Sequence, residues 1–227
     1  RAIDSFVTRR AICGLTSRDY NRLFVRALNA SQESPPTEAG TIVREMLAAQ
    51  TASSGAWPSD SEFMAGLLNA NLYSSQYKAR MRSLLVALEN HLRSALNEDV
   101  GAVSAKKSDL SIEHLLPQKW RTNWPTIDGT DEADAQRQDA VHRLGNLTLL
   151  TRALNPTLSN NDWATKSAEL RRQTLLRLTT SSVFATPTNA DEEWTDHEWS
   201  AVWDEERIRQ RSLWLAQLAV EAWPRPE

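Results

Sequence analysis

The sequence predicts a mainly α-helical fold with one small β-hairpin. Apolar residues recur at helical spacing through most of residues 1–97 and again near the C-terminus. Between these regions, segments 110–115 and 142–151 have the length and residue types of short strands. The 227 residues are 41% hydrophobic and include nine tryptophans, which is enough for a sizeable core.

Five helices are predicted in the first half of the chain, which is expected to be a helical support. A stripe of apolar residues from Tyr20 to Leu28 is the clearest of the amphipathic patterns. Arginines opposite the first two stripes are expected to lie on solvated surfaces: Arg9, Arg10, Arg18, Arg22 and Arg26. The helices are expected at residues 3–13, 17–28, 37–49, 59–69 and 76–96.

The second half is predicted to form a strand, a loop, a second strand and a helix. Pro117 ends the first strand, and the loop at 118–141 is an insertion with at most a helical turn. Gly145 permits a bend in the second strand region, and the next helix begins near Asp162. A last helix carries the stripe from Ile208 to Ala222. The predicted parts are a helical region at 1–108, a central unit at 109–190 and a C-terminal helix at 191–227 that packs back on the bundle.

Composition excludes several classes of protein. The single cysteine, Cys13, rules out an internal disulfide and a multi-cysteine zinc site. No apolar run approaches membrane-spanning length and no signal pattern is present, so a cytoplasmic protein without a membrane partner is expected. The start at Arg1, without a methionine, suggests a piece of a longer protein.

The net charge of −3 argues against a uniformly basic nucleic-acid binder. Eight acids and no Lys or Arg lie in residues 191–206, which leaves 26 basic against 21 acidic residues elsewhere. A locally basic surface is therefore compatible with the sequence.

Two short motifs carry the chemistry of the central unit. The first is Ile112-Glu113-His114-Leu115-Leu116-Pro117, and the second runs from Leu144-Gly145-Asn146-Leu147 to Asn155. Either motif alone is ordinary. Together they project a Glu, a His and two Asn from a strand, loop, strand and helix unit, and these residue types suggest one metal ion and one histidine base acting on a phosphodiester.

These motifs resemble the HNH nucleases of the ββα-metal, or His-Me finger, class. More narrowly, they are similar to the C-terminal nuclease domain of GmrSD-type modification-dependent restriction proteins, which include SspE-like phosphorothioate-sensing effectors. The segment Val7–Thr16 and the closing Ile208-Arg-Gln-Arg helix, which ends in Trp223-Pro224, extend the resemblance over nearly the whole chain.

The resemblance implies a helical bundle joined to a ββα-metal HNH unit. Its implied activity is a metal-dependent DNA endonuclease that nicks phage or plasmid DNA in an anti-phage restriction system of the bacterial cytoplasm. Such proteins normally carry an upstream ParB-like nucleotide-hydrolysing domain. Two alternatives stay open, a non-catalytic nucleic-acid-binding module and an RNase with the same site.

The roles of individual residues follow from the resemblance and from their chemistry. His114 is the candidate base, because histidine titrates near neutral pH. Glu113 and Asn155 are the candidate ligands of one Mg²⁺ or Mn²⁺ ion, which prefers oxygen ligands. In the resembling family, the asparagine at the position of Asn146 orients the histidine by hydrogen bonding.

Other residues have weaker assignments. Asn161 is a rival for the last metal position, and His142 and Lys166 are candidates for supporting or substrate-binding roles. Glu113 stands where Asp is commoner in the HNH class, and the Cys-x-x-Cys pairs of many HNH proteins are missing.

Overall fold

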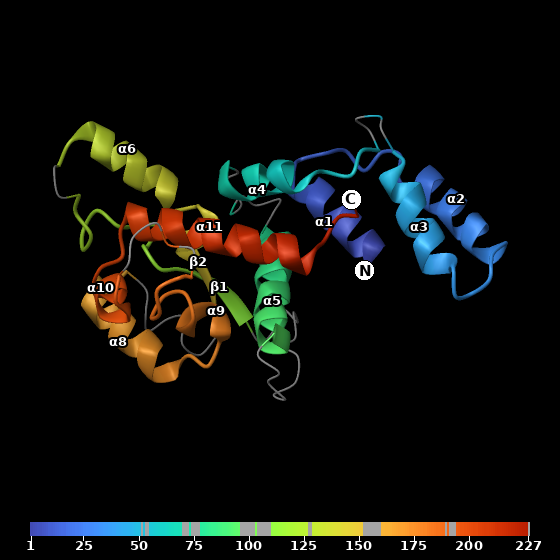
Figure 1. The fold of residues 1–227 in the computed structure, drawn as a ribbon. Helices are drawn as coiled ribbons and strands as arrows, with labels where there is room; N and C mark the ends of the chain where they lie inside the picture. Colours follow the sequence, from blue (N-terminus) through green and yellow to red (C-terminus); the bar gives the residue numbers. More distant parts are fainter. Residues whose placement is uncertain are drawn as a thin grey trace. The chain divides into compact units, whose positions relative to one another are not determined.

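The computed structural model describes most of the chain in two units, each of which is considered by itself (Figure 1). Residues 1–70 with 219–227 form unit 1, and residues 71–218 form unit 2. These boundaries fall at other positions than the three predicted parts. The described residues are all of 1–227 except 51, 53–54, 70–72, 74–77, 96–102, 104–109, 127–128, 152–159, 189, 191–193 and 227.

Unit 1 consists of helices, as the sequence predicts. Their apolar stripes meet in a core of Phe6, Leu23, Leu47 and Trp57. Phe6 packs edge-on against Trp57, with ring centroids 5.7 Å apart. The helices are α1 (Ala2–Ile12), α2 (Tyr20–Gln32), α3 (Ala39–Ala48) and α4 (Asp60–Asn69).

Two arginines of α1 are buried, so the expectation of solvated surfaces is wrong for them. Arg9 and Arg10 are both 0% exposed. Arg9 donates to the carbonyl of Trp223 at 2.7 Å and pairs with Asp60 at 2.6 Å. Arg10 donates to the carbonyl of Ala56 at 2.6 Å. Helical spacing could not reveal these roles, because the acceptors come from segments distant in sequence.

Unit 2 contains the predicted two-stranded antiparallel sheet. Strand β1 (Leu110–His114) pairs with β2 (Leu147–Thr151), and the register sets Glu113 opposite Thr148 and His114 opposite Leu147. Helix α5 (Lys78–Ala95) and the short α9 (Arg177–Thr180) both pack against β2. The remaining elements are α6 (Asp131–Ala140), η1 (Leu144–Asn146), α8 (Trp163–Gln173), α10 (Asp196–Ala201) and α11 (Glu205–Ala222), the last four residues of which belong to unit 1.

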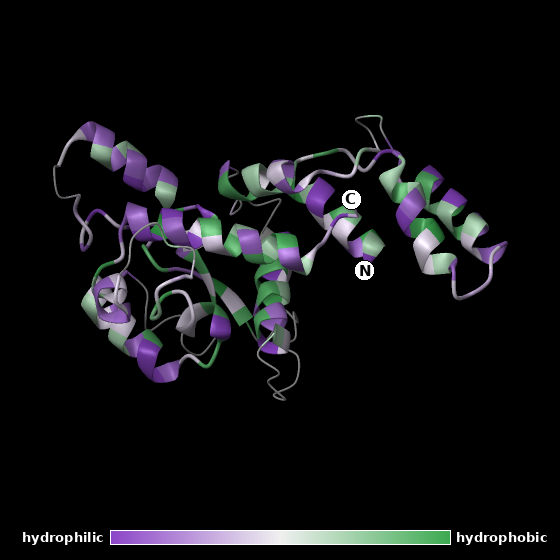
Figure 2. Cartoon of the chain, viewed as in Figure 1, coloured by the Kyte–Doolittle hydropathy of each residue, from purple (hydrophilic) through white to green (hydrophobic). Residues whose placement is uncertain are grey.

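The insertion between the strands is more helical than predicted. A ten-residue helix, α6, replaces the expected helical turn. Its N-cap residue Thr130 accepts from the backbone N–H of Ala133, and three acids in the first turn favour the helix dipole. Figure 2 shows α6 as mainly hydrophilic, which explains why no apolar stripe marked it.

The second strand begins later than predicted. Residues 142–143 form a turn, and Leu144–Asn146 form the 3₁₀ helix η1 before β2 starts at Leu147. Gly145 is required by close packing and not by a bend, because a Cβ there would lie 2.0 Å from the carbonyl oxygen of Ile208 on α11.

Tryptophans fill much of the core of unit 2. Trp120, Trp124, Trp199 and Trp203 are at most 7% exposed and pack with aliphatic residues such as Leu150. Trp120 and Trp124 are therefore core residues of unit 2. Among the described residues, no helix is both long and apolar enough to cross a membrane.

Candidate active site

The end of β1 brings an acid and a histidine into a buried setting. Glu113 is 8% exposed and His114 is 5% exposed. Strand pairing fixes the backbone of both residues, and Pro117 follows shortly after the strand ends. The predicted pair thus lies on a rigid element, which suits a catalytic group.

A buried lysine from the first turn of α8 binds both residues of this pair. Lys166, which is 0% exposed, places its Nζ 2.6 Å from Glu113 Oε1 and donates to the carbonyl oxygen of His114 at 2.6 Å. Helix α8 starts at a well-formed cap, where Asp162 accepts from the backbone N–H of Thr165 at 2.9 Å. The cap fixes where α8 begins and so where Lys166 enters the site.

Burial perturbs the ionisation of this pair. It raises the pKa of Glu113, and the positive charge of Lys166 opposes that rise. Burial also lowers the pKa of Lys166, and the Glu113 carboxylate opposes that change. Each charge is therefore retained in the interior chiefly by the other.

Two aromatic rings contact the imidazole of His114. The ring of Tyr73 lies edge-on to it, with centroids 4.3 Å apart and an interplanar angle of 85°. The ring centroid of His142 lies 5.5 Å from that of His114, at an interplanar angle of 82°. The His142 ring is also stacked on Tyr73, with centroids 5.9 Å apart and an interplanar angle of 3°. The side-chain nitrogen of Gln118 lies 3.4 Å from His114 Nδ1. The two rings and Gln118 restrict the orientation of the candidate base.

The backbone after His114 is held by Asn146, which is 0% exposed. Its Oδ1 accepts from the N–H of Leu116 at 2.7 Å and from the indole N–H of Trp203 at 3.2 Å. Its Nδ2 donates to the carbonyls of Leu116 and Val141, both at 2.8 Å. These four bonds use the full capacity of the amide. Asn146 therefore orients the chain that follows the histidine and does not make the expected bond to its ring.

Helix α11 completes the support of η1 and β2. Arg211 is 0% exposed and donates to the carbonyls of Gly145 at 2.5 Å and Leu147 at 2.8 Å. Ser212 Oγ accepts from the N–H of Gly145 at 2.8 Å. Burial lowers the pKa of Arg211 to about 9, which leaves its guanidinium charged at neutral pH.

The other predicted residues have different settings. His142 joins the ring cluster, and burial lowers its pKa while the charge of Asp139 opposes that change. Asn161 is exposed just before α8, and its carbonyl accepts from the indole N–H of Trp124 at 2.8 Å. Asn155 lies outside the described residues.

The described residues do not by themselves complete a divalent-metal site. They include no group of three His, Cys, Asp or Glu side chains placed to hold an ion. Glu113 supplies one carboxylate, and Lys166 already neutralises it. A metal ion would need a further ligand, such as the predicted Asn155.

Three residues contribute to the site although the sequence motifs do not identify them. Tyr73 comes from a segment with no motif, and nothing near it in the sequence signals its contact with His114. Trp203 and Arg211 lie on the C-terminal elements, where their pattern indicates only core packing. The Ile208-Arg-Gln-Arg run, which carries part of the resemblance, is the one sequence signal that points toward Arg211.

Comparison with known proteins gives one finding. Residues 57–218 match the family described as GmrSD restriction endonucleases, C-terminal domain. No curated protein and no solved structure matches the chain significantly. The matched region includes the acid–histidine pair, Asn146, Lys166 and most of α11. The chain therefore belongs to the GmrSD restriction endonuclease C-terminal domain family.

Proposed function

We propose that this chain is a DNA-nicking endonuclease domain in which His114 is the general base. The observation that carries the proposal is the fixed placement of the His114 imidazole at the end of β1. Lys166 binds its carbonyl oxygen, and the rings of Tyr73 and His142 lie against it. Family membership adds the restriction context and makes DNA the expected substrate.

In the proposed reaction, an imidazole nitrogen of His114 takes a proton from a water molecule as the water oxygen attacks phosphorus. The bond from phosphorus to the 3′-oxygen breaks, and that oxygen leaves as a hydroxyl after it gains a proton. The products carry a 3′-hydroxyl and a 5′-phosphate. Lys166, Tyr73 and Asn146 act as positioning residues, because they hold the histidine and its backbone.

The metal requirement is a separate part of the proposal. A bound Mg²⁺ or Mn²⁺ would stabilise the negative charge that develops on the phosphate. Glu113 is the residue proposed to hold it, with Asn155 as the second ligand and Asn161 as the lesser candidate. An upstream ParB-like nucleotide-hydrolysing domain and a bacterial cytoplasmic location also belong to the proposal.

Cleavage of supercoiled plasmid tests the role of His114. His114→Ala should lower the cleavage rate by about 10²-fold or more, because a positioned base contributes that much. His197→Ala is the matched control, since His197 is exposed on α10. A single site should cut one strand at a time, so nicked circles should precede linear DNA.

The assay also separates the alternatives. If single-stranded or duplex RNA is cleaved with His114 dependence and plasmid is not, the domain is an RNase. If wild-type protein cleaves neither, or His114→Ala cleaves as well as wild type, the catalytic proposal fails. Salt-sensitive DNA binding that survives His114→Ala and falls on neutralising the exposed Arg171 and Arg172 would then indicate a binding module. Lys166 is unsuitable for that test because it is buried.

A further inference from the structure

A cavity of about 450 Å³ lies within unit 1, and its lining includes no residue of the candidate active site. Its walls come from four segments distant in sequence. The first turn of α1 contributes Arg1, α3 contributes Gly40 and Arg44, the loop before α4 contributes Trp57, and the segment after α11 contributes Pro224 and Arg225. Most of this wall lies outside the region that matches the family.

The walls are held in place by buried contacts. Ser5 Oγ lies 3.0 Å from the carbonyl oxygen of Trp223 and 2.9 Å from that of Pro224. Arg9 donates to the same Trp223 oxygen at 2.7 Å. Helix α3 packs against α1. The segment that carries Arg225 and the helix that carries Arg44 are therefore both attached to α1.

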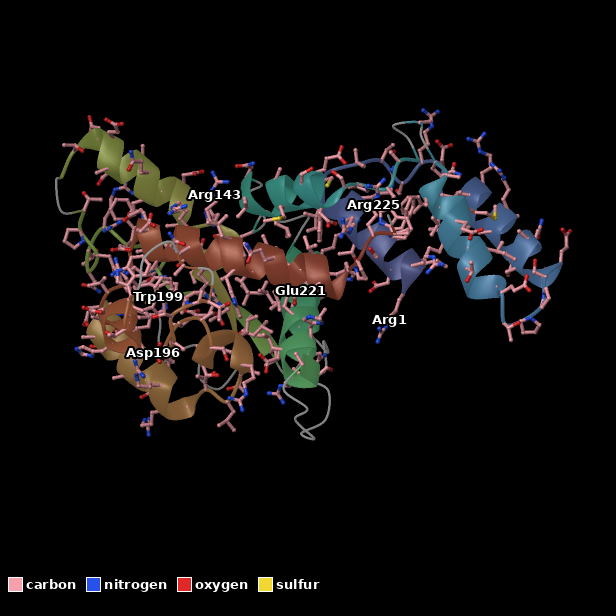
Figure 3. The ribbon with its side chains drawn as sticks, viewed as in Figure 1. Arg1, Arg143, Asp196, Trp199, Glu221 and Arg225 are labelled. Atoms are coloured by element: carbon pink, nitrogen blue, oxygen red, sulfur yellow. The ribbon has the colours of Figure 1, made fainter. Side chains whose placement is uncertain are left out.

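The charge of the cavity is of one sign. Arg1, Arg44 and Arg225 line it, and the part of its lining that the structure describes includes no acidic residue. Within the described part of the chain, none of these three guanidiniums forms an ion pair, whereas the nearby Arg9 pairs with Asp60 at 2.6 Å. Three like charges around one hollow repel each other and focus a positive potential into it. Figure 3 labels Arg1 and Arg225.

The carboxylate of Glu62 does not line the cavity, but the charge of Arg225 acts on it. The pKa of Glu62 is lowered, mainly by hydrogen bonds from Ser59 and in smaller part by Arg225. Both the N–H and the hydroxyl of Ser59 donate to Glu62 Oε2 at 2.8 Å, so this carboxylate belongs to the start of α4. Among the described residues, no negative group therefore lines the cavity itself.

A buried donor in the wall also lacks an acceptor. Trp57 is 3% exposed, and its indole N–H has no hydrogen-bond partner among the described residues. Buried donors are normally satisfied, and leaving one unpaired costs free energy. A ligand rich in acceptor oxygens would neutralise the guanidiniums.

We propose that this cavity binds the phosphate group of a nucleotide or of nucleic acid. Guanidinium groups match phosphate oxygens in charge and in hydrogen-bond geometry. The volume lies in the range of small-molecule sites and can hold a mononucleotide. This inference does not depend on the proposed nuclease function, because the cavity shares no residue with the candidate active site.

Calorimetric titration of the 227-residue chain tests the proposal, with inorganic phosphate and thymidine 5′-monophosphate as probes. Wild-type protein should bind thymidine monophosphate but not thymidine. The double variant Arg44→Ala/Arg225→Ala should weaken binding by about tenfold or more, because it removes two guanidiniums that can form charge-assisted hydrogen bonds to the phosphate. Arg18→Ala/Arg26→Ala, which changes two exposed arginines outside the cavity, should bind like wild type.

Short DNA duplexes with and without 5′-phosphates, titrated in EDTA, distinguish the sources of phosphate. Dependence on the 5′-phosphate would assign the cavity to phosphate monoesters. Equal binding of both duplexes, weakened by the same double variant, would assign it to the DNA backbone. The control variant Arg18→Ala/Arg26→Ala should bind both duplexes like wild type. The proposal fails if neither phosphate probe nor DNA binds, or if the double variant binds all of them as well as the control.

Discussion

Lys166 Nζ and Glu113 Oε1 lie 2.6 Å apart in the interior of unit 2, where the two side chains are 0% and 11% exposed. The same ammonium group holds the carbonyl oxygen of His114. This ion pair therefore fixes the end of β1 from the side of α8.

The first prediction concerns this pair. Lys166→Met should lower the free energy of unfolding by about 3–5 kcal/mol, because it leaves the carboxylate of Glu113 buried without its partner. Urea denaturation measures the loss. The double variant Glu113→Gln/Lys166→Met should be more stable than Lys166→Met, and a less stable double variant would contradict the explanation. Arg172→Met, at an exposed pair on the same helix, should leave the stability close to that of wild type.

The second prediction concerns Asn146. Asn146→Ala should destabilise unit 2 by about 2–4 kcal/mol, because it leaves several buried partners of the amide unsatisfied. Asn123→Ala is the control, since Asn123 is exposed and makes one bond, to the carbonyl of Asn160. Thermal unfolding followed by circular dichroism compares them. Similar unfolding midpoints for both variants would show that the hydrogen bonds of Asn146 do not stabilise unit 2.

The third prediction assigns a positioning role to Tyr73. Tyr73→Leu should lower kcat for plasmid nicking by about tenfold with little change in KM, because small displacements of a catalytic group slow the reaction strongly. Tyr73→Phe keeps the ring that contacts His114 and should retain most of the activity. If Tyr73→Phe is as impaired as Tyr73→Leu, the hydroxyl group and not the ring contact is responsible.

The fourth prediction is dependence on a divalent metal ion. EDTA should abolish plasmid cleavage by wild-type protein, and Mg²⁺ or Mn²⁺ should restore it. Direct binding of Mn²⁺, followed by its paramagnetic resonance signal, should weaken in Glu113→Gln. Undiminished cleavage in EDTA would exclude the metal and leave Glu113 as the partner of Lys166 alone.

The fifth prediction concerns pH. Burial holds the pKa of His142 below its ordinary value of about 6.5. The unfolded chain then binds more protons near and below that pH, so this contribution to stability is present above about pH 6.5 and is lost as the pH falls through the lower folded pKa. Between about pH 7.5 and 5.5, wild type should lose more unfolding free energy than His142→Gln. Equal losses would mean that His142 titrates normally.

The sequence was sufficient for the features that depend on local pattern. Helical spacing predicted α1 to α5 to within a few residues, and strand-like segments placed Glu113 and His114 on β1. The sequence did not predict features that depend on contacts between residues distant in the chain. The role of Gly145 depends on the approach of α11, and the burial of Arg9 depends on acceptors from residues 58 and 223.

The sequence likewise predicted some residues of the candidate site and not others. The acid and histidine are adjacent in sequence, so one motif reveals both. Lys166 reaches them from more than 50 residues away, and a lysine that is buried looks no different in sequence from one that is solvated. Tyr73 has no neighbouring pattern at all, so only the folded structure shows its contact with the histidine.

The hydrogen bonds that Arg211 and Ser212 make to η1 also determine at which point of its synthesis the domain can complete its fold. A chain emerging from the ribosome presents Glu113 and His114 long before α11, yet η1 and β2 lack their buried guanidinium until that last helix has been made. Domains fold as units once their chain is available. On the proposed function, we expect a nascent or truncated chain that lacks α11 to be inactive, although it already carries the acid–histidine motif.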